Sequence, residues 1–392
     1  MTPSARLQAA IEILDEVVAA AESGGAAADT LIARYFKTRR YAGSKDRRAV
    51  RELAYAAIRR AGELPASGRA ALIGLTQDRP ELADLFDGAH NCPAPIGDEP
   101  AAPAGIAPAW LAEKLGAALG PDELPALLDR APLDLRVNRL KATREQVLRE
   151  LPDAAPGALS PDALRLPEGT RVEDLPAFNQ GRIEVQDEGS QLIVAACTPA
   201  PGMTVVDLCA GAGGKTLALA AAMGGQGRLI ACDVDRARLS RLMPRAERAG
   251  ADFIEARLLD GNHEARGIAD LQGQADVVLI DAPCSGTGTW RRNPEARWRL
   301  TPPRLERLRA TQSHVLGFGA PLVKRGGRLV YAVCSLLEEE GPAQVDAFLA
   351  ANPGWERLDP LAAGRPCGPG RRLTPAHDGT DGFFIAVLGR TC

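Results

Sequence analysis

The sequence lacks several features that would assign it quickly to a class of protein. It has no run of about 18 apolar residues, so we expect no membrane span, and its first residues show no apolar stretch typical of a secretory signal. None of the eight cysteines forms a C-x-x-C pair, and none of the four histidines completes a zinc-finger spacing. We therefore expect no bound metal, no secreted disulfide framework, and a reduced cytoplasmic protein.

The sequence also has no large excess of charge of one sign. Its net charge of −3 argues neither for nor against nucleic acid as a partner. Ten Lys or Arg residues nevertheless lie between Arg34 and Arg60, opposed only by Asp46 and Glu52. Such a cluster favours a surface that binds phosphates, because it releases counterions from a nucleic acid. A solvated helix face is the alternative.

The N-terminal part is expected to be helical. One helical face is marked by apolar residues spaced four and three apart: Leu7, Ile11, Leu14, Val18 and Ala21. We expect Ser4 to cap this helix and Gly24 to end it, with further helices over residues 30–36 and 46–61.

A smaller mixed region follows a linker. Residues 89–108 are rich in Ala, Pro and Gly, which is typical of a linker, and helices are expected from 109 to 130. Residues 133–138 alternate like a strand, residues 143–150 are helical in pattern, and residues 152–167 are rich in turn formers. This mixture predicts a small α/β domain.

From about residue 185 onward, strand-like and helical stretches alternate regularly. The expected strands are 204–208, 228–232, 252–256, 276–280, 328–333 and 383–388. This order is typical of a doubly wound, mainly parallel α/β sheet, which binds ligands at the carboxyl ends of its strands. The 392 residues favour two or three domains, with expected boundaries 1–90, 106–195 and 196–392.

A glycine-rich turn follows the first of these strands and precedes a helix. The segment 205–216 reads VVDLCAGAGGKT, and its glycines allow a ligand to approach the backbone at a helix N-terminus. One interpretation is a P-loop ATPase, because Gly214, Lys215 and Thr216 match the end of that motif. The match fails at Cys209, where the motif requires glycine, although residues 277–281 resemble a Walker B strand.

A nucleoside cofactor is the other interpretation of this turn. Asp233 ends the second strand, where a carboxylate can hold ribose hydroxyls, and Asp260 follows the third strand, where it can contact an adenine amino group. Carboxylates suit adenosine, and the sulfonium of S-adenosylmethionine, better than a triphosphate. Alternatively, both residues only cap the helices that follow them.

Two cysteines lie where strands deliver residues to the ligand-binding edge. Cys284 follows the fourth strand in the segment DAPCSGTG, and Cys334 ends a later strand in YAVCS. Cys197 and Cys232, in contrast, lie in apolar runs and are expected to be buried. A thiolate added to carbon 6 of cytosine makes carbon 5 nucleophilic toward a methyl sulfonium, which is covalent catalysis.

This chemistry requires further groups. Asp281 is the candidate for the acidic group near N3 of the base. A populated thiolate requires positive charge nearby, which Lys215 and the arginines at 291, 292, 297 and 299 could supply. The helix after Cys334 is expected to begin at Pro342, too late for its dipole to assist.

At these residues the sequence resembles the NOL/NOP/Sun family of RNA cytosine-5 methyltransferases, and within it the bacterial Sun-type (RsmB-like) enzymes of small-subunit (16S) ribosomal RNA. The resemblance covers most of the chain. It is carried by residues 135–138, 185–191, 207–216, 281–288, 291–294, 331–335 and 378–384.

The resemblance implies a Rossmann-like domain that uses S-adenosylmethionine, a small α/β domain, and a helical N-terminal domain similar to NusB that binds RNA. It implies Cys334 as the nucleophile, assigned on the resemblance alone, with Cys284 assisting product release. The implied cofactor site comprises Cys209, Ala210, Gly211, Ala212, Gly213, Gly214, Lys215, Asp233, Asp260 and Asp281. One departure is Val333, where the family usually has Thr before the cysteine.

Residues 290–309 add seven arginines together with Trp290 and Trp298. Arginines beside aromatic rings suit single-stranded RNA, although both rings could instead pack beneath the arginine side chains. We expect RNA as the partner, no obligate protein partner, and a monomer. A transfer-RNA cytosine-5 methyltransferase and a catalytically silent ribosome-assembly factor remain the alternatives.

Overall fold

The computed structural model describes residues 1–261 and 263–391, so Cys392 lies outside the described residues. The chain divides into two compact units. One comprises Met1–Arg130 with Thr289–Arg304, and the other comprises Ala131–Gly288 with Leu305–Cys392. This division differs from the expected boundaries, because residues 106–130, expected in the second domain, and residues 289–304, expected in the third, fold with the N-terminal helices.

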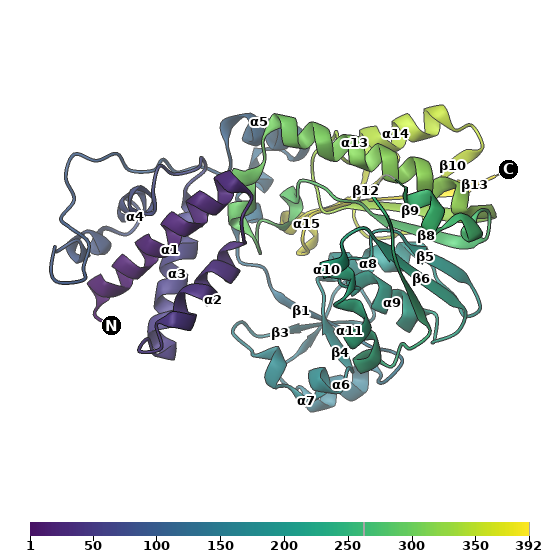
Figure 1. Ribbon diagram of the computed structural model, residues 1–392, viewed down its shortest axis with the longest axis horizontal. Helices are drawn as coiled ribbons and strands as arrows, with labels where there is room; N and C mark the ends of the chain where they lie inside the picture. Colours follow the sequence, from purple (N-terminus) through teal and green to yellow (C-terminus); the bar gives the residue numbers. More distant parts are fainter. Residues whose placement is uncertain (262, 392) are drawn as a thin grey trace. The chain divides into compact units, whose positions relative to one another are not determined.

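The first unit is helical. Its helices are α1 (Pro3–Ser23), α2 (Ala28–Thr38), α3 (Ser44–Arg60), α4 (Gly68–Thr76) and α5 (Ala109–Leu119). Helix α1 packs against α3 and α4 (Figure 1), and residues such as Leu7, Leu14, Ile58 and Leu72 fill the core between them. The three helices expected before residue 62 are therefore confirmed.

Two details of this unit differ from the expectations. Thr2, and not Ser4, caps α1, because Pro3 occupies the first helical position, and the Ser4 hydroxyl donates to Asp87 instead. The helical stretch expected to reach residue 130 ends at Leu119, because Gly120 adopts φ +89° and a proline follows. Short 3₁₀ turns, 121–123 and 125–128, take its place.

The second unit begins with a small antiparallel sheet. Its strands β1 (Leu133–Val137), β2 (Ala155–Pro156), β3 (Ala163–Leu166) and β4 (Ile183–Val185) run in the order β2-β3-β1-β4. Helix α6 (Arg144–Glu150) covers it, capped by Thr143, and buries Val147 against Leu135 and Leu164. The segment expected to be only turn-rich thus contains two strands, β2 and β3.

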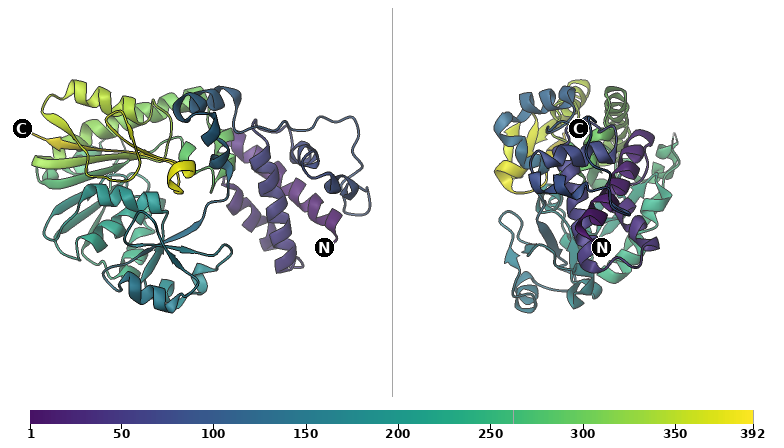
Figure 2. Two further views of the ribbon diagram at one scale, coloured as in Figure 1. Left: turned by 180° about the vertical axis from the view of Figure 1, so that it is seen from behind. Right: turned by 90° about the vertical axis from the view of Figure 1, so that its left-hand side faces the viewer.

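The large sheet of this unit is the expected doubly wound sheet with additional antiparallel strands. Its strands are β5 (Thr204–Asp207), β6 (Arg228–Asp233), β7 (Ile254–Leu258), β8 (Ala275–Asp281), β9 (Val323–Val333), β10 (Trp355–Leu358), β11 (Arg365–Cys367), β12 (Gly370–Leu373) and β13 (Phe383–Arg390). The order is β11-β12-β13-β9-β8-β5-β6-β7, with β10 paired to β13. Strands β7, β6, β5, β8 and β9 are parallel, whereas β13 runs antiparallel to β9 (Figure 2).

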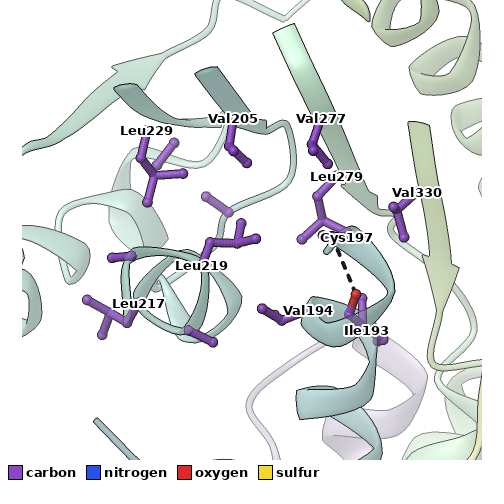
Figure 3. Packing of buried hydrophobic residues seen from close by; sticks show 14 of the residues in the cluster. Ile193, Val194, Cys197, Val205, Leu217, Leu219, Leu229, Val277, Leu279 and Val330 are labelled. Carbon is purple, nitrogen blue, oxygen red and sulfur yellow. Dashed lines mark hydrogen bonds between the residues drawn. The ribbon is translucent and has the colours of Figure 1, made fainter. Parts of the chain in front are cut away.

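Helices cover both faces of the large sheet. On one face lie α8 (Glu188–Cys197), α9 (Gly214–Ala222) and α11 (Leu242–Ala249), and on the other lie α13 (Pro302–Gly319) and α14 (Pro342–Ala351). Figure 3 shows Val205, Leu229 and Val277 directed from the strands toward residues of α8 and α9. Burial of both faces explains why these strands are apolar runs without alternation.

The direction of the chain reverses at β5. The chain passes from β5 to β6 and β7 on one side, and then returns to β8 on the other side of β5. A crevice is expected outside the carboxyl ends of the strands at such a switch point. Among the described residues, no helix is both long and apolar enough to cross a membrane, and no group of His, Cys, Asp and Glu side chains is arranged to hold a metal ion.

Candidate active site

The glycine-rich turn after β5 is held by its neighbour β6. The backbone N–H of Gly211 donates to Asp233 Oδ2 at 2.7 Å, and that of Ala210 donates to the Cys232 carbonyl. Gly213 precedes α9 with φ +86°, and a Cβ there would lie 2.1 Å from the Leu242 side chain. This position therefore requires glycine for both conformation and space.

Space remains open on the other side of the same turn. No described atom would lie within 4 Å of a Cβ built on Gly211 or Gly214. Asp233 is buried, and its second oxygen accepts from the backbone of Asp235, which itself caps the short helix α10 (Arg236–Leu239). Asp235, and not Asp233, therefore caps the helix that follows β6. Asp260 follows β7 with an 81 % exposed side chain, so its carboxylate is accessible to a ligand.

Lys215, in the first turn of α9, and Asp281, the last residue of β8, form an ion pair. Lys215 Nζ lies 2.6 Å from Asp281 Oδ2. Burial would lower the pKa of Lys215, but the charge and hydrogen bond of Asp281 outweigh burial and raise the pKa above its usual value. The site therefore holds a charged ammonium against a carboxylate at the switch point.

The two motif cysteines also meet at this edge. Cys284 follows β8 and Cys334 follows β9, and their sulfur atoms lie 3.3 Å apart. The hydrogen bond to Cys334 and burial raise the pKa of Cys284 well above its usual value, which favours a protonated thiol there. Lys215 interacts electrostatically with Cys334. The two thiols thus have different surroundings, because the raised pKa of Cys284 favours its neutral form and Lys215 places a positive charge near Cys334.

Three further cysteines lie in packed surroundings: Cys197 in α8, Cys209 in the glycine-rich turn and Cys232 in β6. Cys197 and Cys232 are fully buried in apolar clusters, as expected, and burial raises the pKa of Cys232 to about 12. Burial also raises the pKa of Cys209, within the glycine-rich turn, well above its usual value. None of these three side chains is prepared to act as a thiolate nucleophile.

Asp207 is a buried carboxyl group beneath the turn. It ends β5, is 1 % exposed, and accepts a hydrogen bond at 2.7 Å from the Thr216 hydroxyl. Burial, opposed by that bond and reinforced by the charge of Asp281, raises its pKa to about 7. This carboxyl group connects the strand to helix α9.

Glu340 is a site residue that the sequence patterns did not reveal. It is fully buried, and its carboxylate accepts hydrogen bonds from Ser285, Ser335 and Gln312. Glu338, Glu339 and Glu340 stand in a row after Cys334, and nothing in their order distinguishes the buried one. In the sequence, a serine follows each of the two motif cysteines, and this was the signal that could have indicated a shared hydrogen-bond acceptor.

The departure at Val333 has a packing explanation. Its side chain is fully buried within the apolar cluster that also contains Ile280, Leu316 and Phe384. An apolar residue is well suited to that environment, where a hydroxyl would need a hydrogen-bond partner.

The interpretation of Trp290 and Trp298 as stacking platforms for RNA is wrong. Both side chains are buried, and the Trp298 indole donates to the carbonyl of Ala61 at the end of α3. Arg297 is also fully buried and donates to the carbonyls of Ile58, Arg59 and Ala61. Arg299 likewise donates to backbone carbonyls, those of Gly25 and Ala26. Arg297 and Arg299 thus stabilise the helical unit and are not the expected positive setting of a thiolate.

The basic cluster of the helical unit is largely exposed. We call its exposed members the basic surface: Arg34, Lys37, Arg40, Lys45, Arg47, Arg48 and Arg51. Tyr41 follows Arg40 directly in the chain, and its side chain is 75 % exposed. Arg39 is instead occupied in the fold, since it stacks on Tyr35 and pairs with Glu12. A basic helix face with one exposed aromatic ring is suited to binding nucleic acid.

Comparison with known proteins places these features in a family. The family model described as 16S rRNA methyltransferase RsmB/F matches residues 194–389, which is half of the chain, and one described as an RsmF/B-like ferredoxin-like domain matches residues 107–173. The probable ribosomal RNA small subunit methyltransferase B of Synechocystis sp. is 37 % identical over 300 residues, and the ribosomal RNA small subunit methyltransferase B of Salmonella arizonae is 37 % identical over 289. Each match covers 72 % of this chain and 66 % of the relative, just under two thirds of its length.

Solved structures agree with this placement. The crystal structure of PH0851 covers 100 % of this chain and 99 % of its own, at 25 % identity and a TM-score of 0.79. A methyltransferase homolog protein from Pyrococcus horikoshii covers 72 % of this chain and 94 % of its own, at 28 % identity and a TM-score of 0.63. The expected fold class, a Rossmann-like sheet with a helical N-terminal region, is confirmed. The chain belongs to the 16S rRNA methyltransferase RsmB/F family.

Proposed function

We propose that this protein transfers a methyl group from S-adenosylmethionine to carbon 5 of a cytosine in small-subunit (16S) ribosomal RNA. The observation that carries this proposal is the meeting of two thiols, Cys334 and Cys284, 3.3 Å apart, beside the Lys215–Asp281 ion pair. The family and the names of the curated relatives support ribosomal RNA as the substrate.

The residues around the glycine-rich turn fit S-adenosylmethionine. Open space beside Gly211 and Gly214 lets a ligand approach the backbone, and Asp233 lies where a carboxylate accepts from ribose hydroxyls. Asp260, exposed after β7, would reach the adenine amino group. When bound, the cofactor supplies an electrophilic methyl group on a sulfonium.

On the base, Cys334 forms the covalent bond. Its thiolate adds to carbon 6, and the electrons of the carbon 5–carbon 6 double bond move to carbon 5. Carbon 5 would use them to bond the methyl carbon while the methyl–sulfonium bond breaks, which leaves a neutral thioether. The Asp281–Lys215 pair holds a proton near N3, which lowers the energy of the adduct. Loss of the carbon 5 proton to a base then restores the double bond and expels the Cys334 thiolate. Cys284, held as a thiol at 3.3 Å, assists this release.

The RNA would be held in part by the basic surface of the helical unit. Exposed arginines and lysines there can contact phosphates, and Tyr41 can stack on an unpaired base. The target cytosine must leave its stack to reach the thiol.

A methyl-transfer assay tests the proposal. Labelled S-adenosylmethionine and protein-free small-subunit RNA, taken from cells that lack this gene, are incubated with the wild type, Cys334→Ala or Cys284→Ala. Cys92→Ala is the matched control, because Cys92 belongs to the helical unit and to neither cysteine motif. We expect label at cytosine carbon 5 with the wild type and the control, and none with Cys334→Ala.

The other outcomes are informative as well. If Cys284→Ala abolishes transfer and Cys334→Ala does not, the roles of the two thiols are reversed. If small-subunit RNA accepts no label but transfer RNA, tested in a parallel reaction, does, the enzyme class stands and the substrate is wrong. If cofactor binds but no RNA is labelled, the protein is a silent assembly factor and the proposal fails.

A further inference from the structure

Glu340 is a buried carboxylate whose hydrogen bonds all come from the segments around the two cysteines and from α13. It is 0 % exposed, and both of its oxygens are occupied. Oε1 accepts from the Ser285 backbone at 2.8 Å and from Gln312 Nε2 at 2.9 Å. Oε2 accepts from the hydroxyls of Ser335, at 2.5 Å, and Ser285. A buried charge is tolerated only when it is satisfied in this way.

On the Cys284 side, the network holds both residues that flank the cysteine. Glu340 binds the backbone and the hydroxyl of Ser285 directly. Gln312, fully buried on α13, donates to Glu340 and also to the carbonyl of Pro283 at 3.0 Å. The backbone on either side of Cys284 is therefore fixed relative to Glu340.

On the Cys334 side, the network holds the residue that follows. The Ser335 hydroxyl donates to Glu340, lies 3.2 Å from the Thr287 hydroxyl, and accepts from the Leu337 backbone. The carbonyl of Cys334 itself accepts from Gly288 at 3.0 Å. Glu340 is in turn anchored, because its own carbonyl accepts from the buried Tyr331 hydroxyl at 2.7 Å.

We propose that Glu340 is a positioning residue that holds the Cys284 and Cys334 loops in register, so that the two thiols meet at the base. This inference rests on the proposed function in that it takes these thiols as the reacting groups. The carboxylate touches neither sulfur, so it acts through Ser285 and Ser335.

The chemistry of the network explains why a carboxylate is used here. Four donors converge on this group, and a carboxylate accepts at both oxygens without donating. An amide of the same shape could still accept from the Ser285 backbone and Gln312 with its oxygen, while its NH2 donated to the two hydroxyls, which can also accept. Glu340→Gln should therefore preserve most of the geometry, whereas Glu340→Ala removes the link altogether.

The negative charge of Glu340 has a second consequence. The hydrogen bond with Cys334, burial and the charge of Cys334 raise the pKa of Cys284 most. The charge of Glu340 raises it further. The same side chain that aligns the loops thus also favours the neutral form of the releasing thiol.

The test compares the full-length wild type with Glu340→Ala, Glu340→Gln and Glu338→Ala. Glu338 is the matched control, because it belongs to the same turn but is 61 % exposed and pairs with Arg372. Thiol geometry is read without RNA, as the rate at which diamide oxidises Cys284 and Cys334 to a disulfide, which mass spectrometry identifies. Cofactor affinity, kcat and KM for RNA, and thermal unfolding are measured on the same proteins.

For Glu340→Ala we expect slower disulfide formation and a kcat about tenfold to a hundredfold lower, since small displacements of reacting groups are costly. Its cofactor affinity should stay within about twofold of the wild type, as Glu340 is remote from the glycine-rich turn in the hydrogen-bond network. Glu340→Gln should recover most of both rates, and Glu338→Ala should resemble the wild type.

The inference would be overturned if folded Glu340→Ala formed the disulfide at the wild-type rate and kept the wild-type kcat. If Glu340→Ala does not fold, Ser285→Ala replaces it, because it removes one hydroxyl from the network, and unchanged rates would then count against the inference equally. A wild type that transfers no methyl group while Glu340→Ala still slows disulfide formation would refute the proposed function and leave the positioning role standing.

Discussion

Lys215 Nζ lies 2.6 Å from Asp281 Oδ2, so the first residues of helix α9 and the end of strand β8 are joined by an ion pair at the switch point of the sheet. Both side chains are only partly exposed, 14 % for Lys215 and 28 % for Asp281. The pair lies between the glycine-rich turn and the cysteine motif that follows β8. It connects the part of the site that we propose binds the cofactor with the part that we propose binds the base.

Breaking this pair should slow methyl transfer. We expect Lys215→Met to lower kcat about tenfold to a hundredfold, because a partly buried carboxylate loses its partner and the proton near N3 is no longer held. Asp281→Asn should have a similar effect, and the double variant should be little worse than either alone, since the two act as a unit. Steady-state kinetics of the three variants measure this coupling. Strictly additive losses would show that the two side chains act separately.

Asp233→Asn should weaken the binding of S-adenosylmethionine. Both oxygens of Asp233 accept backbone hydrogen bonds, from Gly211 and Asp235, and an amide can satisfy only one of them. The turn is then held less firmly in the conformation that fits the ligand, and one acceptor for the ribose hydroxyls is lost, so we expect a Kd at least about fivefold higher. Titration calorimetry measures the change. Asp235→Asn is the control, because Asn caps a helix as well as Asp does; equal effects of both substitutions would contradict the prediction.

Asp207 should make stability depend on pH. Burial raises its pKa to about 7, so between about pH 4 and pH 7 the folded state holds a proton that the unfolded state has released. The contribution of this group to stability therefore falls as the pH rises through that window. Asp207→Asn removes the effect, so its free energy of unfolding relative to the wild type should increase from pH 5 to pH 8. Denaturant unfolding at several pH values tests this, and a constant difference between the proteins would refute it.

Arg297→Lys should destabilise the helical unit. One guanidinium donates to three carbonyls at the end of α3, and a lysine ammonium cannot reproduce that fork. Leaving buried carbonyls unsatisfied costs about 2–3 kcal/mol. The measurement is hydrogen exchange at the amides of α3, with calorimetry of the whole protein. Arg299→Lys serves as the control, because its carbonyl contacts are exposed, and it should change protection little.

The basic surface should account for part of the salt dependence of RNA binding. We expect the combined change of Lys37, Arg40 and Arg48 to glutamine to weaken binding at low salt. The slope of log K against log salt should fall by up to about 0.7–0.9 for each phosphate that is no longer neutralised. Tyr41→Ala should weaken binding without changing that slope. Arg39→Gln is a useful comparison, since this side chain is already held by Tyr35 and Glu12. Unchanged slopes would mean that the basic surface faces solvent and does not contact RNA phosphates.

Much of the architecture could be predicted because local patterns are consistent with it. Alternating apolar runs and helical stretches predicted the parallel strands, and the carboxyl ends of such strands share one edge whatever their order. The motifs around Asp233, Asp281, Cys284 and Cys334 could therefore be assigned to one region before any distance was known. The C-terminal strands β10 to β12 escaped prediction, because short antiparallel strands carry little pattern of their own.

Tertiary structure alone decided the features that depend on which groups become neighbours. Cys284 and Cys334 are 50 residues apart, and the pairing of β8 with β9 brings their sulfur atoms within 3.3 Å. The pattern of Arg297 and Trp298 favoured RNA binding, but both side chains are buried and donate hydrogen bonds to the carbonyl of Ala61 at the end of α3. Among three consecutive glutamates, only Glu340 lies within reach of both serines. The sequence by itself determined which chemical groups are present and at which edge they emerge; their distances, burial and charge environment follow from packing between distant segments, which no local pattern encodes.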